Sequence, residues 1–254
     1  MIHSVKESVA DKFEHDGYLV VRKLAKINLL RSMNHLVHKA LNPLQGPAEY
    51  EADVGYPGAP ISRDGIGGHT PRRLLHAYSR DEIFRRWAAA PSIVDYLRQL
   101  TGQPDHMLSQ CHHNCVMCKH PGFSSSTAWH QDMRYWSFDK PDLISVWLAL
   151  GSERQRNGAL WIIPGSHKLS LGRGRFDANL FLRSELRENQ ELFNQAIMIE
   201  LEPGDTLFFH CRLFHAAGTN ESKDVKLATV FTYHTLQNKP IPGTRSNQFP
   251  SIPV

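Results

Sequence analysis

The sequence predicts a mainly β fold, an antiparallel sandwich or jelly roll with helices packed on the outside. Two patterns point to it. Before Pro104, apolar residues recur at helical spacing, and after it short β-rich runs are separated by turn residues. The length of 254 residues suits one all-β domain. We therefore expect a single domain over 1–254, with a helical part over 1–104, a jelly-roll core over 105–236 and a tail over 237–254.

Helices are predicted near the N-terminus, over residues 4–16, 28–41 and 81–100. In the first helix Val5, Val9 and Phe13 share one face, and Gly17 ends it. Pro91 indicates that a new helix begins inside the third range. A short strand is expected over 18–21. The Gly- and Pro-rich stretch over 45–70 predicts a long loop, either a binding segment or a surface excursion.

The β-rich part predicts seven strands and one helical insert. The strands are expected over 107–119, 127–133, 143–150, 159–163, 196–201, 206–214 and 226–234, and the insert over 180–193. Many short strands of this kind, following a helical segment, are what place the chain in the jelly-roll class.

Composition argues against a disordered protein, a collagen-like chain and a disulfide scaffold. Lys and Arg exceed Asp and Glu by 29 to 25, and 41% of the residues are hydrophobic, which is ordinary for a globular protein. No apolar run has the length of a membrane span, and the first residues lack the apolar core of a signal peptide. We expect a cytoplasmic protein without membrane or nucleic-acid partners. Arg63, Arg72 and Arg73, beside the Gly-rich loop, are expected to be solvated rather than to meet an anionic substrate.

The cysteine-rich stretch CHHNCVMC has a superficial likeness to a metal site. Val116 and Met117, however, have the character of a strand, on which Cys115 and Cys118 point to opposite faces. We therefore expect Cys111, Cys115 and Cys118 to be reduced thiols rather than zinc or iron–sulfur ligands.

Two polar motifs indicate chemistry. On a strand, His130 and Asp132 of WHQD project to the same face. Far downstream, a strand after the Pro-Gly-Asp turn places Phe209, Cys211, Leu213 and His215 on one face and His210 on the other. Two histidines and one carboxylate form the ligand set of non-haem Fe(II) oxygenases, and zinc is the main chemical competitor.

Two long stretches resemble the phytanoyl-CoA dioxygenase (PhyH-like) family of Fe(II)/2-oxoglutarate-dependent oxygenases. They are AWHQDMRYWSFDKPDLISVWLALGSERQRNGALWIIPGSHK and LEPGDTLFFHCRLFHAAGTNESKDVKLATVFTYH, and the opening FEHDGYLVVRKL is also similar. The ordered combination of H-x-D, N-G-A-L, P-G-S-H, P-G-D and H-x-x-G-x-N carries the resemblance. It implies a double-stranded β-helix (jelly roll, cupin-like) with iron between two sheets.

The resemblance also implies a set of site residues. The catalytic metal ligands correspond to His130, Asp132 and His215, the last chosen over His210 because of the glycine and asparagine that follow it. The family's arginine for the 5-carboxylate of 2-oxoglutarate is replaced by Lys226. Arginine binds a carboxylate with two parallel hydrogen bonds and lysine as a point charge, so the change is not conservative. The resemblance also implies that the cosubstrate pocket is lined by Gln131 and Trp147. It implies that the substrate contacts Arg134, Tyr135 and Trp136.

The implied function is that of an Fe(II)- and 2-oxoglutarate-dependent dioxygenase. It would hydroxylate an aliphatic C–H bond of a small molecule with O₂ and release succinate and CO₂. A carboxylate at Asp132 argues against halogenation, in which related enzymes leave a place for chloride. Desaturation, epoxidation and ring formation stay open, because the same oxidant serves them all. Two alternatives of other classes also stay open, a zinc-dependent hydrolytic enzyme and a non-catalytic ligand-binding domain on the same fold.

Overall fold

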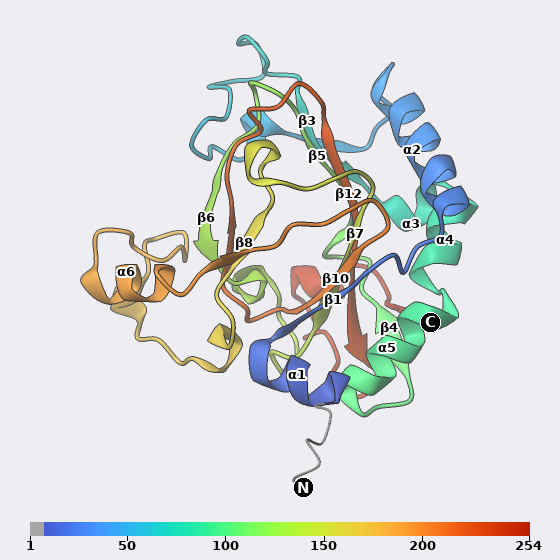
Figure 1. Ribbon diagram of the computed structural model, residues 1–254, viewed down its shortest axis with the longest axis vertical. Helices are drawn as coiled ribbons and strands as arrows, with labels where there is room; N and C mark the ends of the chain where they lie inside the picture. Colours follow the sequence, from blue (N-terminus) through green and yellow to red (C-terminus); the bar gives the residue numbers. More distant parts are fainter. Residues whose placement is uncertain (1–7) are drawn as a thin grey trace, which may run out of the picture.

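Two β-sheets face one another in the computed structural model, and most of the helices cover the outer side of the larger sheet (Figure 1). The structure describes residues 8–254. The expected beginning of the first helix, including Val5, lies outside the described residues. The arrangement is the predicted mainly β, jelly-roll fold with flanking helices.

The larger sheet has nine strands within residues 8–254, all paired antiparallel. Its main path runs in the order β1 (Tyr18–Val21), β10 (Thr206–His210), β7 (Ile144–Ala149), β12 (Lys226–Thr235), β5 (Asn114–Lys119), β3 (Pro71–Leu75) and β2 (Ala48–Tyr50). At one side β4 (His106–Leu108) pairs with β12, and β13 (Ile252–Pro253) pairs with β4. The sheet therefore draws strands from the helical part and from the tail as well as from the predicted core.

The smaller sheet has four strands in the same part of the chain and is also antiparallel. Its order is β6 (Thr127–His130), β11 (His215–Ala217), β8 (Leu160–Ile162) and β9 (Ile197–Met198). The outlying helix α6 (Arg187–Phe193) lies beyond this sheet (Figure 1).

Alternation along the strands divides the apolar side chains between two cores. The core between the sheets includes Trp147, Leu160, Ile162, Leu207, Phe209 and Val230. The core between the larger sheet and the helices includes Met33, Val37, Trp87, Leu97, Val146, Leu148, Phe208 and Phe231. Because the larger sheet is covered on both faces, its central strands β7 and β12 are almost wholly buried.

The helices begin and end at recognisable signals. Ser8 caps α1 (Val9–Asp16) by accepting a hydrogen bond from the backbone N–H of Asp11. Gly17 ends it at φ +78°, and an added Cβ there would lie 2.4 Å from His167 Nδ1. The other helices are α2 (Ile27–Leu41), α3 (Ala77–Arg80), α4 (Glu82–Ala88) and α5 (Pro91–Thr101). The prediction of a helix start at Pro91 is confirmed.

Several predicted boundaries are wrong. The strand expected over 206–214 ends at His210, because the backbone then turns (Leu213 N–H donates to the carbonyl of His210) and crosses to the smaller sheet. The strand expected over 127–133 also ends early, and Asp132 begins the short 3-10 helix η2 (Asp132–Tyr135). The stretch predicted as a loop contains strand β2, and strand β3, which was not predicted, follows it directly. The helical insert expected over 180–193 is limited to α6. None of the helices within residues 8–254 combines the length and apolarity that crossing a bilayer requires.

A buried carboxylate, Asp205, ties β1 to the turn that precedes β10. It accepts hydrogen bonds from Arg22 Nη1 at 2.7 Å, from the backbone N–H of Lys23 at 2.8 Å and from that of Glu202 at 2.9 Å. Burial alone would raise the pKa of Asp205, but these donors outweigh it and hold the pKa below its ordinary value. The charged form is therefore the one that the fold stabilises.

We expect Asp205→Asn to lower the free energy of unfolding at pH 7 by about 1–3 kcal/mol, because charge-assisted hydrogen bonds are lost. A carboxyl whose pKa falls on folding stabilises above its unfolded pKa, so the difference from the wild type should shrink below about pH 4. Urea unfolding at the two pH values measures this. The exposed Asp64→Asn is the control, and an equal loss in both variants would contradict the assignment.

Candidate metal centre and cavity

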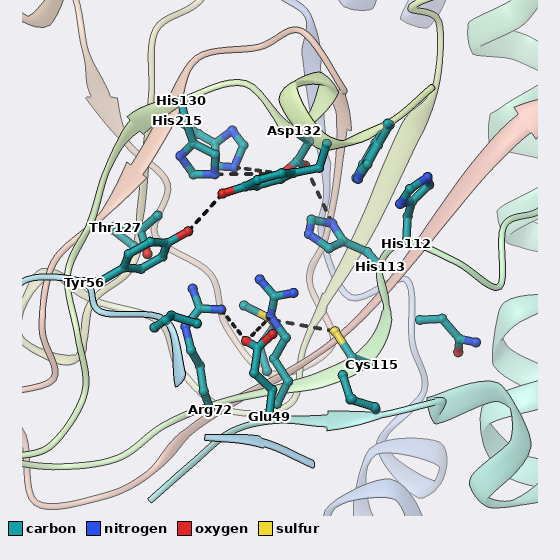
Figure 2. Close-up of a pocket in the computed structure, with 18 of the residues that line it drawn as sticks. Glu49, Tyr56, Arg72, His112, His113, Cys115, Thr127, His130, Asp132 and His215 are labelled. Atoms are coloured by element: carbon teal, nitrogen blue, oxygen red, sulfur yellow. Dashed lines mark hydrogen bonds and ion pairs between the residues drawn. The ribbon is translucent and has the colours of Figure 1, made fainter. Parts of the chain in front are cut away.

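Three side chains converge at one end of the smaller sheet (Figure 2). His130 ends β6, His215 begins β11, and the register of these two strands places them directly opposite each other. Asp132 begins η2, two residues beyond β6. Its Oδ1 lies 3.9 Å from His130 Nε2 and 3.6 Å from His215 Nε2, and all three donor atoms lie within 4.8 Å of one another.

Both imidazoles are oriented through their other nitrogen. His130 Nδ1 lies 2.8 Å from the carbonyl oxygen of Ala128, and His215 Nδ1 lies 3.0 Å from that of Leu213. A carbonyl only accepts hydrogen bonds, so each Nδ1 carries a proton and Nε2 is the nitrogen left to face a metal. Burial, together with His215, lowers the pKa of His130 well below its ordinary value. His130 is thus neutral at physiological pH and suited to metal binding.

The carboxylate completes the donor set. Asp132 is only 4% exposed, and its Oδ2 has no hydrogen-bond partner, with His113 Nδ1 at 3.6 Å. An unsatisfied buried carboxylate oxygen is costly unless a cation is bound nearby. Two imidazoles and one carboxylate on one side of a cavity fit a divalent metal with open coordination positions. Within residues 8–254, no other three His, Cys, Asp or Glu side chains bring their donor atoms together in this way.

His210 lies apart from this group. It ends β10 in the larger sheet, its Nε2 is 3.5 Å from Asp142 Oδ1, and its ring packs against His167. Sequence alternation had placed His210 and His215 on opposite faces of one strand, whereas they belong to different sheets. The three-residue set chosen from the resemblance is nevertheless the one that converges.

A cavity of about 1010 Å³ opens between the sheets beside the three donors. Charged and aromatic side chains from both halves of the chain line it. Figure 2 shows Tyr56, Arg72 and His113 reaching toward the same space as His130 and His215. This volume is at the upper end of what small-molecule sites occupy.

Lys226 and Trp147 both line this wall, and both contact Glu153, a residue that the sequence did not single out. Lys226 begins β12, and its Nζ lies 3.0 Å from Glu153 Oε2. Trp147 Nε1 donates to Glu153 Oε1 at 2.7 Å, and the ammonium lies 5.0 Å from the centre of the Trp147 ring. All three side chains are buried. Glu153 lies in a loop with no motif of its own, so only the fold shows that it pairs with Lys226.

The side chain of Gln131 points away from the cavity. Its amide donates to the carbonyl of Arg212, and it is not part of the cavity wall. The structure therefore does not bring Gln131 together with Lys226 and Trp147, because Gln131 lies between the two metal-ligand positions and projects away from the side that they share.

Of the three expected substrate residues, Tyr135 and Trp136 line the cavity, and Arg134 lies beside it. Arg134 donates to the hydroxyl of Tyr56 at 2.9 Å and to the carbonyl of Asn179 at 2.9 Å. The hydroxyls of Tyr56 and Tyr135 are 3.2 Å apart, and Arg134 also contacts the hydroxyl of Tyr135. Trp136 is buried, with its ring centre 4.8 Å from that of His112. Tyr135 and Trp136 line the cavity directly, and Arg134 holds the rim together.

The expectation that the arginines beside the Gly-rich loop are solvated holds only for Arg63. Arg63 is exposed and pairs with Asp53 at 2.7 Å. Arg72 is 7% exposed and pairs with Glu49 at 2.8 Å, and Arg73 Nε lies 3.3 Å from the same carboxylate. The reason is β3, which pairs with β5 and carries both side chains to the cavity.

Three of the four cysteines are buried, and Cys111 is partly exposed. All four are free, and burial raises the pKa of Cys115 to about 11 and that of Cys118 to about 12. Thiols with such values stay protonated at neutral pH and are poor metal ligands.

Fold and donor geometry together define a double-stranded β-helix protein with a two-histidine, one-carboxylate metal centre. The family model described as phytanoyl-CoA dioxygenase (PhyH) matches residues 13–228. The chain belongs to this family.

Named relatives agree with this assignment. The chain is 28% identical over 161 residues to a probable phytanoyl-CoA dioxygenase of Caenorhabditis elegans (61% of this chain, 51% of the relative). It is 26% identical over 234 residues to the peroxisomal phytanoyl-CoA dioxygenase of Homo sapiens (85% and 64%). The chain thus spans about half to two thirds of these relatives. It is also 23% identical over 247 residues to an ectoine dioxygenase of Sphingopyxis alaskensis (91% and 76%).

Solved structures share the fold. EctD from S. alaskensis, with 2-oxoglutarate and 5-hydroxyectoine, superimposes with a TM-score of 0.72 at 20% identity, covering 94% of this chain and 82% of EctD. The epimerase SnoN, in complex with Fe³⁺, alpha ketoglutarate and nogalamycin RO, gives 0.71 at 19% identity, covering 92% and 84%. The predicted double-stranded β-helix is confirmed.

We expect His215→Ala to weaken the binding of Co(II), a spectroscopic stand-in for Fe(II), by at least about a hundredfold, because it removes a ligand rather than a ligand's support. Titration followed by Co(II) absorbance measures the affinity. His210→Ala is the matched control, since it deletes the neighbouring histidine, and it should stay within about threefold of the wild type. Equal losses in both variants would contradict the proposed ligand set.

Proposed function

We propose that the protein is an Fe(II)- and 2-oxoglutarate-dependent oxygenase that hydroxylates an aliphatic C–H bond of a small molecule and releases succinate and CO₂. The convergence of His130, Asp132 and His215 on one side of a large cavity carries the proposal. Three protein ligands on one face leave adjacent positions for a chelating cosubstrate and O₂. Family membership and the fold shared with 2-oxoglutarate-bound structures support it.

The cavity residues divide into two proposed roles. His130, Asp132 and His215 hold Fe(II), and Lys226 binds the 5-carboxylate of 2-oxoglutarate beside Trp147. When bound, iron and 2-oxoglutarate supply the oxidising power for C–H hydroxylation by O₂. Glu153 holds the Lys226 ammonium at 3.0 Å and leaves two of its N–H groups for the cosubstrate. The protein contributes orientation and exclusion of water.

The substrate is proposed to enter at the mouth formed by Arg134, Tyr135 and Trp136. The tyrosine hydroxyls of the rim and the buried Trp136 offer hydrogen bonds and an apolar surface near the metal ligands. With about 1010 Å³ available, the cavity has room for an organic substrate beside the cosubstrate. A small-molecule substrate and O₂ are therefore the proposed partners. The cytoplasmic location and the absence of nucleic-acid or membrane partners stay predictions from the sequence.

Two features favour this function over the alternatives. A zinc hydrolase has no use for an ammonium held in the cavity wall, whereas a dicarboxylate cosubstrate needs one. A non-catalytic binding domain has no use for a complete set of three converging metal donors with an unsatisfied carboxylate oxygen.

We expect the protein with Fe(II), ascorbate and 2-oxoglutarate to form succinate in air, faster when a substrate from a metabolite screen is present. Lys226→Met should raise the KM for 2-oxoglutarate by about 10–100-fold, because a charged hydrogen bond is lost, and change kcat much less. Chromatographic measurement of succinate gives both constants.

The exposed Lys223→Met serves as the control, since it removes the same charge three residues away. His130→Ala should abolish succinate formation. Zn(II)-dependent hydrolysis without succinate would replace the proposal with the zinc alternative, and succinate formation that survives His130→Ala would exclude the proposed metal centre.

A further inference from the structure

The cavity wall formed by β2 and β3 contains a pair of opposite charges, Glu49 and Arg73. The two residues lie opposite each other in the register of these strands, and both line the cavity. Arg73 Nε is 3.3 Å from Glu49 Oε1, and the two side chains are 24% and 26% exposed. Figure 2 shows Glu49 across the cavity from His130 and His215. The pair is therefore accessible from the space beside the metal donors.

The hydrogen bonds of this pair are incomplete. Glu49 Oε1 accepts a hydrogen bond from Arg72 Nη1 at 2.8 Å, whereas Glu49 Oε2 accepts none from residues 8–254. The guanidinium of Arg73 donates no hydrogen bond within the same residues, and its Nε is buried without a partner. A buried donor without an acceptor is costly. The pair thus offers a ligand a free guanidinium fork and, beside it, a free carboxylate oxygen.

Both groups of the pair are charged. Burial would raise the pKa of Glu49, but Arg73 and Arg72 outweigh it and hold the pKa below its ordinary value. Burial would lower the pKa of Arg73, but Glu49, followed by Cys115 and Asp132, raises it above its ordinary value. A ligand therefore meets one full positive and one full negative charge.

The four charged side chains that meet here sum to zero. Arg72 lies 2.8 Å from Glu49 and 3.8 Å from Glu51, so two arginines are balanced by two glutamates. A ligand that carries only a carboxylate would add an uncompensated negative charge, and one that carries only an amine would add a positive one. A zwitterion adds neither, and each of its charges finds an opposite charge in the wall.

The pair lies apart from the proposed cosubstrate position. Strand β5 separates β3 from β12, so the strand of Arg73 is about 10 Å from the strand of Lys226. On the other side, the guanidinium of Arg72 lies 5.2 Å from the centre of the Tyr56 ring, and the hydroxyl of Tyr56 belongs to the rim of the cavity. The pair is therefore placed to meet the substrate.

We propose that Arg73 and Glu49 bind the zwitterionic head of an α-amino acid substrate, with its carboxylate on Arg73 and its ammonium on Glu49. This inference rests on the proposed function and names its substrate class. Because the two protein groups are in direct contact, the two ligand charges must lie on neighbouring atoms, as they do in an α-amino acid.

The arrangement also selects the part of the substrate that reacts. With the head held by Arg73, the amino-acid side chain would extend through the cavity toward the metal centre, past the apolar Met117 that lies opposite Arg73 on β5. The reaction is then R–H + 2-oxoglutarate + O₂ → R–OH + succinate + CO₂, in which R–H is a C–H bond of that side chain.

The test uses the Fe(II)-loaded protein with 2-oxoglutarate and the proteinogenic amino acids as probes. Anaerobic calorimetry measures binding, and succinate formed in air measures coupling. We expect at least one amino acid with an apolar side chain to bind and to accelerate succinate formation by about tenfold or more. Its amide and its des-amino acid should each bind at least about tenfold more weakly, because each leaves one charge of the wall without a partner.

Two variants assign the two contacts. Arg73→Gln should raise the Kd of the amino acid by about tenfold or more and leave that of the amide within about twofold. Glu49→Gln should raise the Kd of the amino acid equally and leave that of the des-amino acid within about twofold. The Kd of 2-oxoglutarate should stay within about threefold in both. The exposed ion pair Arg63–Asp53 is the matched control, and Arg63→Gln and Asp53→Asn should behave as the wild type.

Thermal melting identifies any variant that does not fold. Arg73→Lys keeps the charge but not the fork, so it should fold and weaken amino-acid binding less than Arg73→Gln does. The comparison of amino acid, amide and des-amino acid on the wild-type protein does not depend on any variant.

The outcomes separate this inference from the proposed function. Absence of binding by every amino acid, or a des-amino acid that binds as tightly as its amino acid, overturns the zwitterion subsite. So does an equal loss of 2-oxoglutarate affinity in Arg73→Gln, which would show that Arg73 only supports the wall. In each case, wild-type protein that binds 2-oxoglutarate leaves the proposed function standing. Wild-type protein that binds none overturns the proposed function itself.

Discussion

The antiparallel register of β6 and β11 is the constraint on which the site depends. It places His130 directly opposite His215, with ring centres 4.2 Å apart, although 85 residues separate them in the sequence. A slip of one residue would turn one imidazole to the opposite face of the smaller sheet and leave two ligands. The chain reaches this register by leaving the larger sheet at His210 and turning over four residues, so that β11 begins at the ligand.

The cavity wall is stabilised by paired charges. Lys226 pairs with Glu153, and Arg72 pairs with Glu49. Lys226, Arg72 and Glu49 line the cavity, and Glu153 is buried behind Lys226. Removing one member of such a pair leaves an uncompensated buried charge, which costs far more than the pair contributes. The pairs therefore hold charged groups at the cavity of an otherwise apolar sandwich, whereas the Lys119 ammonium donates to two backbone carbonyls.

Local patterns in the sequence predicted the element types well and the strand ends poorly. Periodicity located α2, β7 and β12 to within one or two residues, since each has a regular apolar face. It merged β10 with the turn after it, because Leu213 and Phe214 are buried in that turn and resemble a continuing strand. The converging donors His130, Asp132 and His215 were identified from the order of the family motifs along the chain. That order does not depend on where the strands end.

The ion pairs between residues far apart in the chain could not be predicted from the sequence. Glu153 is an unremarkable loop glutamate until β7 and β12 bring Trp147 and Lys226 to it. Arg72 and Lys119 likewise have polar neighbours in the sequence and become cavity residues only because β3 and β5 belong to the larger sheet. Such roles follow from strand order, and no spacing rule along the chain encodes it.

In the proposed site, a lysine at position 226 in place of the family's arginine has a physical reason in this wall. A guanidinium binds one carboxylate through a planar fork, whereas an ammonium distributes three donors in space. At position 226 one donor is already directed to Glu153, so a fork would be half occupied, while an ammonium still has two donors for a ligand. In the proposed site, the distal carboxylate is therefore bound by a point charge that Glu153 holds in place, rather than by the planar fork of an arginine.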